Sequence, residues 1–233
     1  MLAFMKAVTF SYDDGVTQDQ RLIDIFDRYG LKCTFNINSG LLGNANALIR
    51  ENVTVAHVKP RACEIRNIYK GHEIAAHTLT HPCLCDLPDG EVVRQVEEDR
   101  LALSELAGYE VVGMAYPGGG KNHDSRVVRL IREHTKIKYA RTIISSNCFD
   151  LQDDLLVFRP TVYHHESMSA LFESGKRFLA AETDAPQILY VWGHAYEFDI
   201  HNTWGQFEEF CRMISGHSDI FYGTNKEVLL SKK

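Results

Sequence analysis

KAVTFSYDDG, residues 6–15, is a run of β-branched and aromatic residues that ends in two adjacent aspartates and a glycine. Its first part, residues 6–11, has the composition of a β-strand. Asp13 and Asp14 follow this strand, and two carboxylates so close together raise one pKa unless a cation lies nearby. The pair therefore points to a bound metal. An Asp-Gly turn that simply closes the strand explains the same residues equally well.

Short apolar runs alternate with amphipathic stretches along the rest of the chain, which is the pattern of strands joined by helices. Further strands are predicted at residues 33–37, 73–76, 111–115, 139–144, 155–158, 187–192 and 220–223. Helices are predicted at residues 18–29, 63–70, 89–106, 125–134, 167–182, 207–214 and 225–230. Residues 41–60 show neither pattern and are expected to be irregular.

This order of elements predicts the fold class. Helices between consecutive strands act as crossover connections, which place the strands parallel to one another. Seven or eight such units in 233 residues predict an α/β fold, a distorted (β/α) barrel of seven or eight parallel strands. No internal repeat or linker is visible, so we expect a single domain over residues 1–233. No GxGxxG motif follows the first strand, which argues against dinucleotide binding.

Composition narrows the partners of the protein. The formal net charge is −6 and the pI is near 6.0, whereas nucleic-acid binding needs clustered lysine and arginine, so we expect no nucleic-acid partner. No apolar run is long enough for a membrane span, so no membrane contact is expected either. The first eleven residues contain one lysine and no extended apolar core, and the six cysteines are sparse. Both features predict a cytoplasmic protein with reduced thiols.

Residue types that carry chemistry gather at the ends of the predicted strands. The carboxyl ends of parallel barrel strands share one face, and such folds place their active sites there. Core packing does not require acids and histidines at these positions, so we expect them to form one site. They are Asp13, Asp14, His77, His81, residues 116–120, Arg141 and His194. His164 and His165 could reach the same face but are expected to be a surface pair.

A metal site is predicted from the segment HTLTH, residues 77–81. On a helical turn, histidines four residues apart share one face and can bind one ion. Asp14 would add an oxygen ligand, and two histidines with one carboxylate are typical of a catalytic metal site with an open position. This donor set suits a divalent metal, zinc first, with cobalt or nickel as alternatives. The two histidines alone are more typical of an unliganded surface pair than of a metal site.

Four segments resemble the polysaccharide deacetylase family, the NodB-type domains of carbohydrate esterase family 4. SYDDG, residues 11–15, resembles the family's TFDDG motif, and HTLTH resembles its HSxxH or HTxxH motif. AYPGG, residues 115–119, and VWGH, residues 191–194, resemble its third motif and the last strand that leads to a catalytic histidine. The four segments occur in the family's order and span most of the chain.

The resemblance implies a metal-dependent hydrolase. The implied metal ligands are Asp14, His77 and His81, the general base is Asp13, and the general acid is His194. The backbone N–H after the proline of the third segment would help to hold the oxyanion. The residues expected to contact the substrate are Tyr116, Pro117, Gly118, Arg141 and Trp192.

Two positions depart from the family pattern. Many members carry an arginine two residues before the proline of the third segment, where it orients the base, and Ala115 stands there in this chain. No DxxDW-like segment is found, and the nearest sequence is NCFD at residues 147–150. We hypothesise that Arg141 fixes Asp13 in place of the missing arginine. A salt bridge at the strand end explains Arg141 equally well.

The expected reaction is hydrolysis of an N-acetyl group on an amino sugar, with an N-acetylated mono- or oligosaccharide as substrate. Two alternatives on the same scaffold are an O-acetyl sugar esterase and a hydrolase of non-sugar amides or cyclic ureides. A third alternative is a sugar-binding domain without catalysis. Asp13 and His194 argue against the third alternative, because binding alone requires neither residue.

Overall fold

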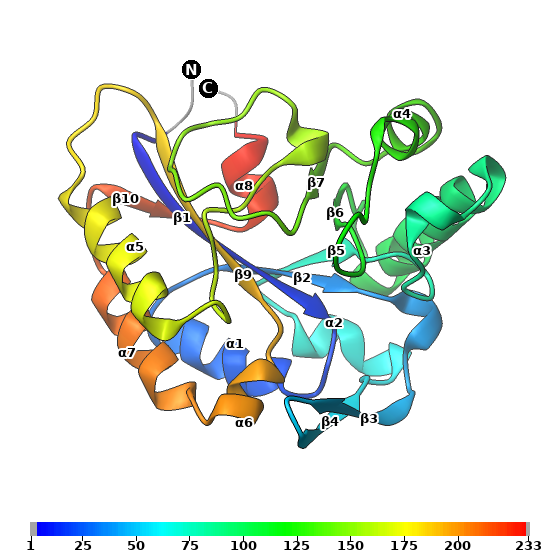
Figure 1. Ribbon diagram of the computed structural model, residues 1–233, viewed down its shortest axis with the longest axis horizontal. Coiled ribbons are helices and arrows are strands. Elements are labelled where there is room, and N and C mark those ends of the chain that lie inside the picture. The colour runs from blue at the N-terminus through cyan, green and yellow to red at the C-terminus, as the bar shows by residue number, and fades with distance from the viewer. Residues whose placement is uncertain (1–3, 232–233) are drawn as a thin grey trace.

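The computed structural model describes residues 4–231, and in this range eight parallel strands form the main sheet. They are β1 (Lys6–Asp14), β2 (Cys33–Ile37), β5 (Glu73–Ala76), β6 (Gly113–Ala115), β7 (Tyr139–Arg141), β8 (Val162–Tyr163), β9 (Gln187–Gly193) and β10 (Ile220–Tyr222). Their order is β7-β6-β5-β2-β1-β9-β8, with β10 beside the first part of β1. The sheet curls into a distorted barrel with helices around it, which confirms the predicted fold class (Figure 1). Residues 1–3, part of the segment expected to carry no secretory signal, and residues 232–233 lie outside the described range.

Strand β1 is the central strand, and all nine of its residues are buried. It pairs with β9 along one edge and with β10 and then β2 along the other. Pairing with β2 continues to Asp14, so β1 is three residues longer than the sequence pattern predicts. Asp13 and Asp14 therefore lie within the ladder of the central strand and not in a turn after it.

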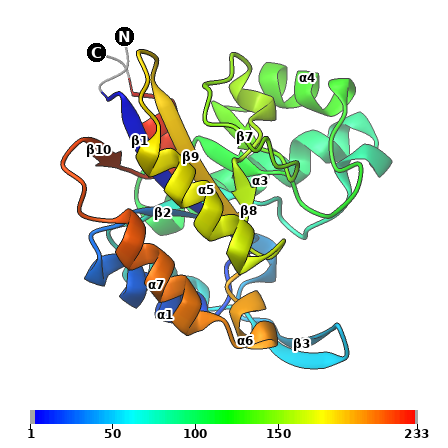
Figure 2. The ribbon, with the colours of Figure 1, turned by 60° about the vertical axis from the view of Figure 1, so that its left-hand side comes forward.

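The longer helices pack around the outside of the sheet, each with buried apolar residues on the side that faces it. The helices are α1 (Asp19–Arg28), α2 (Ile65–Ile68), α3 (Asp89–Ala107), α4 (Ser125–His134), α5 (Met168–Ala180), α6 (Glu197–His201), α7 (Trp204–Ile214) and α8 (Asn225–Leu229). In Figure 2, α5 and α7 lie on one side of the barrel and α3 and α4 on the other. Phe10 of β1 packs against Phe26 of α1, with ring centroids 4.7 Å apart. Within residues 4–231, no helix is long and apolar enough to cross a membrane.

The strand predicted at residues 155–158 is wrong. Leu155–Val157 is a 3₁₀ helix, and the side chain of Asp154 starts it by accepting a hydrogen bond from the Leu156 backbone N–H at 3.0 Å. Only Phe158 touches the sheet, as a single parallel bridge to Arg141. The next strand, β8, is two residues long. β7 and β8 lie at opposite ends of the strand order, and the Phe158 bridge to Arg141 is the one isolated parallel bridge beside β7 within residues 4–231.

Residues 41–60, expected to be irregular, contain a β-hairpin of β3 (Ala45–Arg50) and β4 (Val53–Val58). Nearly all residues of β3 are exposed on both faces, so the alternation that identifies a half-buried strand is absent. Glu51 and Asn52 form the turn with φ values of 50° and 64°, as two-residue hairpin turns require. The hairpin pairs with no strand of the barrel and lies near the arrowhead of β1, next to α6 (Figure 1).

The close approach of β6 and β7 gives a stability prediction. A Cβ atom at Gly113 would overlap the ring of its buried cross-strand neighbour Tyr139. We expect Gly113→Ala to lower the free energy of unfolding by about 1–3 kcal/mol, because the ring must leave its position. Gly90 in α3 has no atom within 4 Å of an added Cβ, so Gly90→Ala should be neutral or stabilising by up to about 1 kcal/mol. Urea denaturation of both variants measures this, and equal midpoints would contradict the prediction.

Candidate metal centre and catalytic cavity

A cavity of about 900 Å³ lies at the carboxyl ends of the central strands. The predicted site residues that line it are Asp13, Asp14, His77, His81, Tyr116, Gly118, Trp192 and His194. Pro117 and Arg141 are not among its lining residues. Side chains that are far apart in sequence thus meet in one place, because parallel strands bring their carboxyl ends together.

His77 and His81 converge, but not on a helix as the spacing suggested. Residues 77–81 are a loop, in which Thr78 and His81 have φ values of 67° and 60°. The two imidazole rings have their centroids 4.9 Å apart. Asp99 of α3 fixes the loop, because its carboxylate accepts a hydrogen bond from the His77 backbone N–H at 2.9 Å. The expectation of a helical turn was wrong, because four-residue spacing alone does not distinguish a helix from a folded loop.

The ring of His77 presents a free nitrogen to the cavity. Nδ1 lies 2.9 Å from the carbonyl oxygen of Ala115, so this nitrogen carries the proton and donates it. The other nitrogen, Nε2, then has a lone pair, and it is buried with no hydrogen-bond partner among the described residues. Burial lowers the pKa of His77 to about 4, so the ring is neutral at physiological pH. A buried, neutral imidazole with one unused lone pair is what a metal ligand requires.

Asp14 divides its two carboxylate oxygens between two sets of partners. Oδ1 lies 3.9 Å from Nε2 of His77 and 3.7 Å from Nε2 of His81. Oδ2 lies 3.1 Å from Nε2 of His57, in β4, and Lys59 donates to the Asp14 backbone oxygen. Burial alone would raise the pKa of Asp14, but His57 and Lys59 hold it well below the usual value. Asp14 is therefore an ionised side chain with one oxygen directed at the two histidines.

Asp14, His77 and His81 fit a divalent metal ion. Each offers one ligand atom, and these atoms all lie within 4.8 Å of one another. Two ligands held 2.0–2.1 Å from a tetrahedral ion lie roughly 3.3 Å apart, so small side-chain movements would complete the geometry. The orphaned Nε2 of His77 and the mixed nitrogen and oxygen donors support the same interpretation.

Asp13 is held separately by Arg141. The guanidinium donates from Nη2 to Asp13 Oδ2, and Asn36 donates to Oδ1 at 2.8 Å. Arg141 also donates from Nε to Ser11 Oγ at 3.2 Å and from Nη1 to the Thr142 backbone oxygen at 3.0 Å. Arg141 therefore lies behind Asp13, where the hypothesis of a substitute arginine places it, and not in contact with the cavity as a substrate-binding residue would. Burial would raise the pKa of Asp13, but Arg141 above all lowers it below the usual value.

His194 is held by Glu197 of α6, a contact that was not predicted from the sequence. Nδ1 of His194 lies 3.0 Å from Glu197 Oε1, and its backbone N–H donates to Oε2 at 3.0 Å. Burial opposes the charge on His194, but Glu197 raises its pKa to about 9. His194 is therefore protonated at neutral pH. Glu197 follows His194 by three residues, and this helical spacing is the signal that could have identified it.

Glu197 also binds two further side chains. Tyr163 donates its hydroxyl to Oε1, and His164 Nε2 lies 3.0 Å from Oε2. His164 is buried, with Nδ1 2.8 Å from the hydroxyl of Tyr12, so the expectation of a surface pair with His165 was wrong. Burial would raise the pKa of Glu197, but His194 and His164 keep it well below the usual value. Glu197 thus remains a carboxylate and fixes the orientation of His194.

The AYPGG segment, residues 115–119, and Trp192 form part of the cavity wall. Gly118 has a φ of 80°, and no hydrogen bond of its N–H is found within residues 4–231. Tyr116 is buried and donates its hydroxyl to the Leu156 backbone oxygen at 2.9 Å. Trp192 stacks on Tyr163 with ring centroids 4.1 Å apart, and the Arg141 guanidinium lies 4.3 Å from its ring. These contacts leave the Gly118 N–H available to a bound molecule and occupy most of the Trp192 ring.

Comparison with known sequences identifies relatives of this chain. The profile of the family described as polysaccharide deacetylase matches residues 5–136. A chitooligosaccharide deacetylase from Rhizobium leguminosarum bv. phaseoli is 29% identical over 115 residues, which are 48% of this chain. The match covers 40% of the length of that protein, so the chain spans less than half of this relative.

Solved structures share the fold at low sequence identity. The Puue allantoinase superposes with a TM-score of 0.70 at 11% identity, over 98% of this chain and 90% of its own. A family 4 acetyl xylan esterase from Clostridium thermocellum, in complex with a cobalt ion, has a TM-score of 0.59 at 14% identity and 97% and 91% coverage. A family 4 pseudoenzyme from Bacillus anthracis also has a TM-score of 0.59 at 14% identity, with 97% and 66% coverage. The family profile, unlike these structures, matches at the level of sequence and covers more than half of the 233 residues, so this protein belongs to the polysaccharide deacetylase family.

Proposed function

We propose that this protein is a metal-dependent hydrolase that removes acetyl groups from N-acetylated sugars. The observation that carries the proposal is the arrangement of charge in one cavity. Asp13 is an ionised carboxylate, His194 is a protonated imidazole, and both lie beside the three side chains that fit a metal. A base and an acid kept in opposite protonation states at the same pH are the requirement for amide hydrolysis.

The chain's own groups can carry out each proton movement of that reaction. A divalent ion held by Asp14, His77 and His81 would supply Lewis acidity at the acyl group. Asp13 accepts a proton from the attacking water, and the Gly118 N–H donates to the oxygen of the former carbonyl. His194 donates its proton to the departing nitrogen, so one water and one amide yield acetate and a free amine. Arg141 and Glu197 keep the base and the acid in place.

The family and the size of the cavity support the proposed substrate class. A volume of about 900 Å³ is within the range of small-molecule sites, which run to roughly 1,000 Å³. An N-acetylated mono- or short oligosaccharide is of that size, and the rhizobial relative is named for chitooligosaccharides. We propose zinc as the metal and the cytoplasm as the location, in line with the donor set and the sparse cysteines.

A second candidate reaction is hydrolysis of a non-sugar amide or a cyclic ureide. The specific observation in its favour is the similarity to an allantoinase along nearly the whole chain. An O-acetyl sugar ester is a third candidate, since the same base and acid serve an ester as well as an amide. Asp13 and His194 with their positioning partners argue against a sugar-binding domain without catalysis, because binding alone requires neither.

The first prediction concerns the metal and the base. Acetate release from N-acetylglucosamine and short chitooligosaccharides should disappear after chelation and return with zinc or cobalt. Asp13→Asn should lower kcat by about 10²–10⁴-fold, because the proton acceptor is lost while the three ligands remain. Its zinc content, measured by mass spectrometry, should equal that of the wild type.

Asp24→Asn on the exposed side of α1 is the matched control and should leave kcat unchanged. Release by the chelated protein, or at the wild-type rate by Asp13→Asn, would remove the proposed mechanism. Metal-dependent hydrolysis of allantoin or of O-acetylated xylan, with no release from N-acetylated sugars, would replace the proposed substrate by one of the other candidates.

The second prediction concerns Glu197. His194 must be protonated to act as an acid, and its pKa of about 9 places the alkaline limb of the kcat profile near that pH. Glu197→Gln removes the negative charge that raises this pKa. The alkaline limb should therefore move to lower pH by about one to three units. Glu209→Gln on the exposed side of α7 should leave the limb in place. An unchanged limb in Glu197→Gln would show that Glu197 does not control the protonation of His194.

A further inference from the structure

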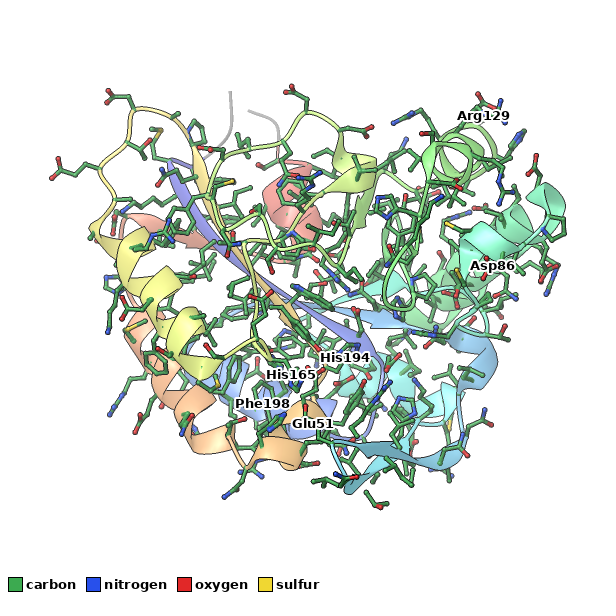
Figure 3. All side chains as sticks on the ribbon, viewed as in Figure 1. Glu51, Asp86, Arg129, His165, His194 and Phe198 are labelled. Atoms are coloured by element: carbon green, nitrogen blue, oxygen red, sulfur yellow. The ribbon has the colours of Figure 1, made fainter. Side chains whose placement is uncertain are left out.

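A second group of potential ligands lies on the rim of the cavity, apart from the Asp14 centre. Glu51 is in the turn of the β3–β4 hairpin, His165 lies between β8 and α5, and His201 is the last residue of α6. Each offers one ligand atom, and these atoms lie within 4.8 Å of one another. Figure 3 shows Glu51 and His165 at the same end of the barrel as His194. Three separate elements thus direct ligand atoms at one point.

The three side chains lie close together without forming hydrogen bonds to one another. Oε1 of Glu51 lies 3.4 Å from Nε2 of His165 and 3.7 Å from Nε2 of His201. No hydrogen bond joins the three side chains within residues 4–231, although the two imidazole rings have their centroids 4.7 Å apart. Ligands on a tetrahedral ion with bonds of 2.0–2.1 Å lie roughly 3.3 Å apart, close to these separations. Two imidazoles and one carboxylate are also a donor set that zinc accepts.

The position of the hairpin depends on contacts at its tip. An isolated two-stranded hairpin is marginally stable at best, and this one pairs with no other strand. Its base is held by Lys59 and by a hydrogen bond from Thr17 N to Val58 O at 2.9 Å. Toward its tip, Leu48, Ile49 and Arg50 form part of the cavity lining, and nearly all of β3 is exposed. Val55 is buried in the core and His57 meets Asp14, so the strands of the hairpin are held at points away from the tip. A bond at Glu51 would add a direct link between the tip and the opposite rim.

We propose that Glu51, His165 and His201 form a second divalent-cation site, and that a zinc-type ion there fastens the hairpin tip across the rim of the cavity. The ion links the hairpin to α6 and to the segment before α5. The site is independent of the proposed reaction, because none of its three residues takes part in it. Ions bound there change the opening of the cavity and leave the Asp14 centre as it is.

Calorimetric titration of the chelated protein with zinc chloride tests the site. The wild type should bind two ions per chain, and the double variant Glu51→Gln/His201→Gln should bind one. The matched control Glu133→Gln/His134→Gln changes an exposed pair of the same residue types, 3.9 Å apart, with no third ligand among residues 4–231, and it should bind two. A double variant that binds as many ions as the wild type would overturn the proposal.

Asp14→Asn separates the two sites. One ion in the wild type and none in Asp14→Asn would mean that the Glu51 group binds nothing, which overturns the proposal. If the wild type binds only one ion, and that ion remains in Asp14→Asn but is lost in Glu51→Gln/His201→Gln, the second site is supported. That result would also show that the Asp14 centre binds no zinc, which contradicts the proposed function. Failure of the second site and failure of the proposed function thus give different results.

Hydrogen exchange tests the tether. The Asp14 site is filled with zinc first. Free zinc at ten times the dissociation constant of the Glu51 site should then slow amide exchange in residues 45–58 about tenfold, because the hairpin can open only after the ion is released. The Glu51→Gln/His201→Gln variant should show no slowing, and the Glu133→Gln/His134→Gln control should behave as the wild type. Equal exchange with and without zinc in the wild type would overturn the tether even if the ion binds.

Discussion

Two adjacent carboxylates at the end of the central strand impose the main constraint on this protein. Asp13 and Asp14 are only 2% and 7% exposed, and a buried charge is costly unless it is paired and hydrogen-bonded. Each of the two buried charges has its own set of hydrogen-bond and ion-pair partners. Asp13 has Arg141 and Asn36, and Asp14 has the hairpin residues and the two histidines. Because the partners differ, two identical side chains next to each other can take the two different roles proposed for them.

The curl of the sheet is what makes this compensation possible. Strand β7, which carries Arg141, is four strand spacings from β1 in the sheet order. In a flat sheet that distance would be about 19 Å, well beyond the length of an arginine side chain. Closing the sheet brings β7 across the barrel from β1, so the guanidinium reaches Asp13 through the interior. The ion pair and the barrel shape therefore depend on each other, and an open sheet could not keep Asp13 ionised in this way.

Most correct predictions from the sequence came from two sources. One is the local periodicity of apolar residues, and the other is that the carboxyl ends of parallel strands share one face. The bounds of β2, β5 and α4 agree with the predicted ranges, because their apolar pattern is local. The convergence of Asp13, Asp14, His77, His81 and His194 followed from parallel strands alone. The β3–β4 hairpin was missed because it has no buried face and hence no alternation. The conformation of residues 77–81 depends on two residues with positive φ, which their spacing does not reveal.

The hairpin has a consequence for how such enzymes diversify. It is one continuous segment that joins the barrel only at its two ends and shares no ladder with it. Insertions or replacements at its tip can therefore accumulate without disturbing the register of any barrel strand. His57 and Lys59, near its base, meet Asp14 and limit what can change there. The shape of the cavity entrance can therefore change at the hairpin while β1 and β9 keep their register.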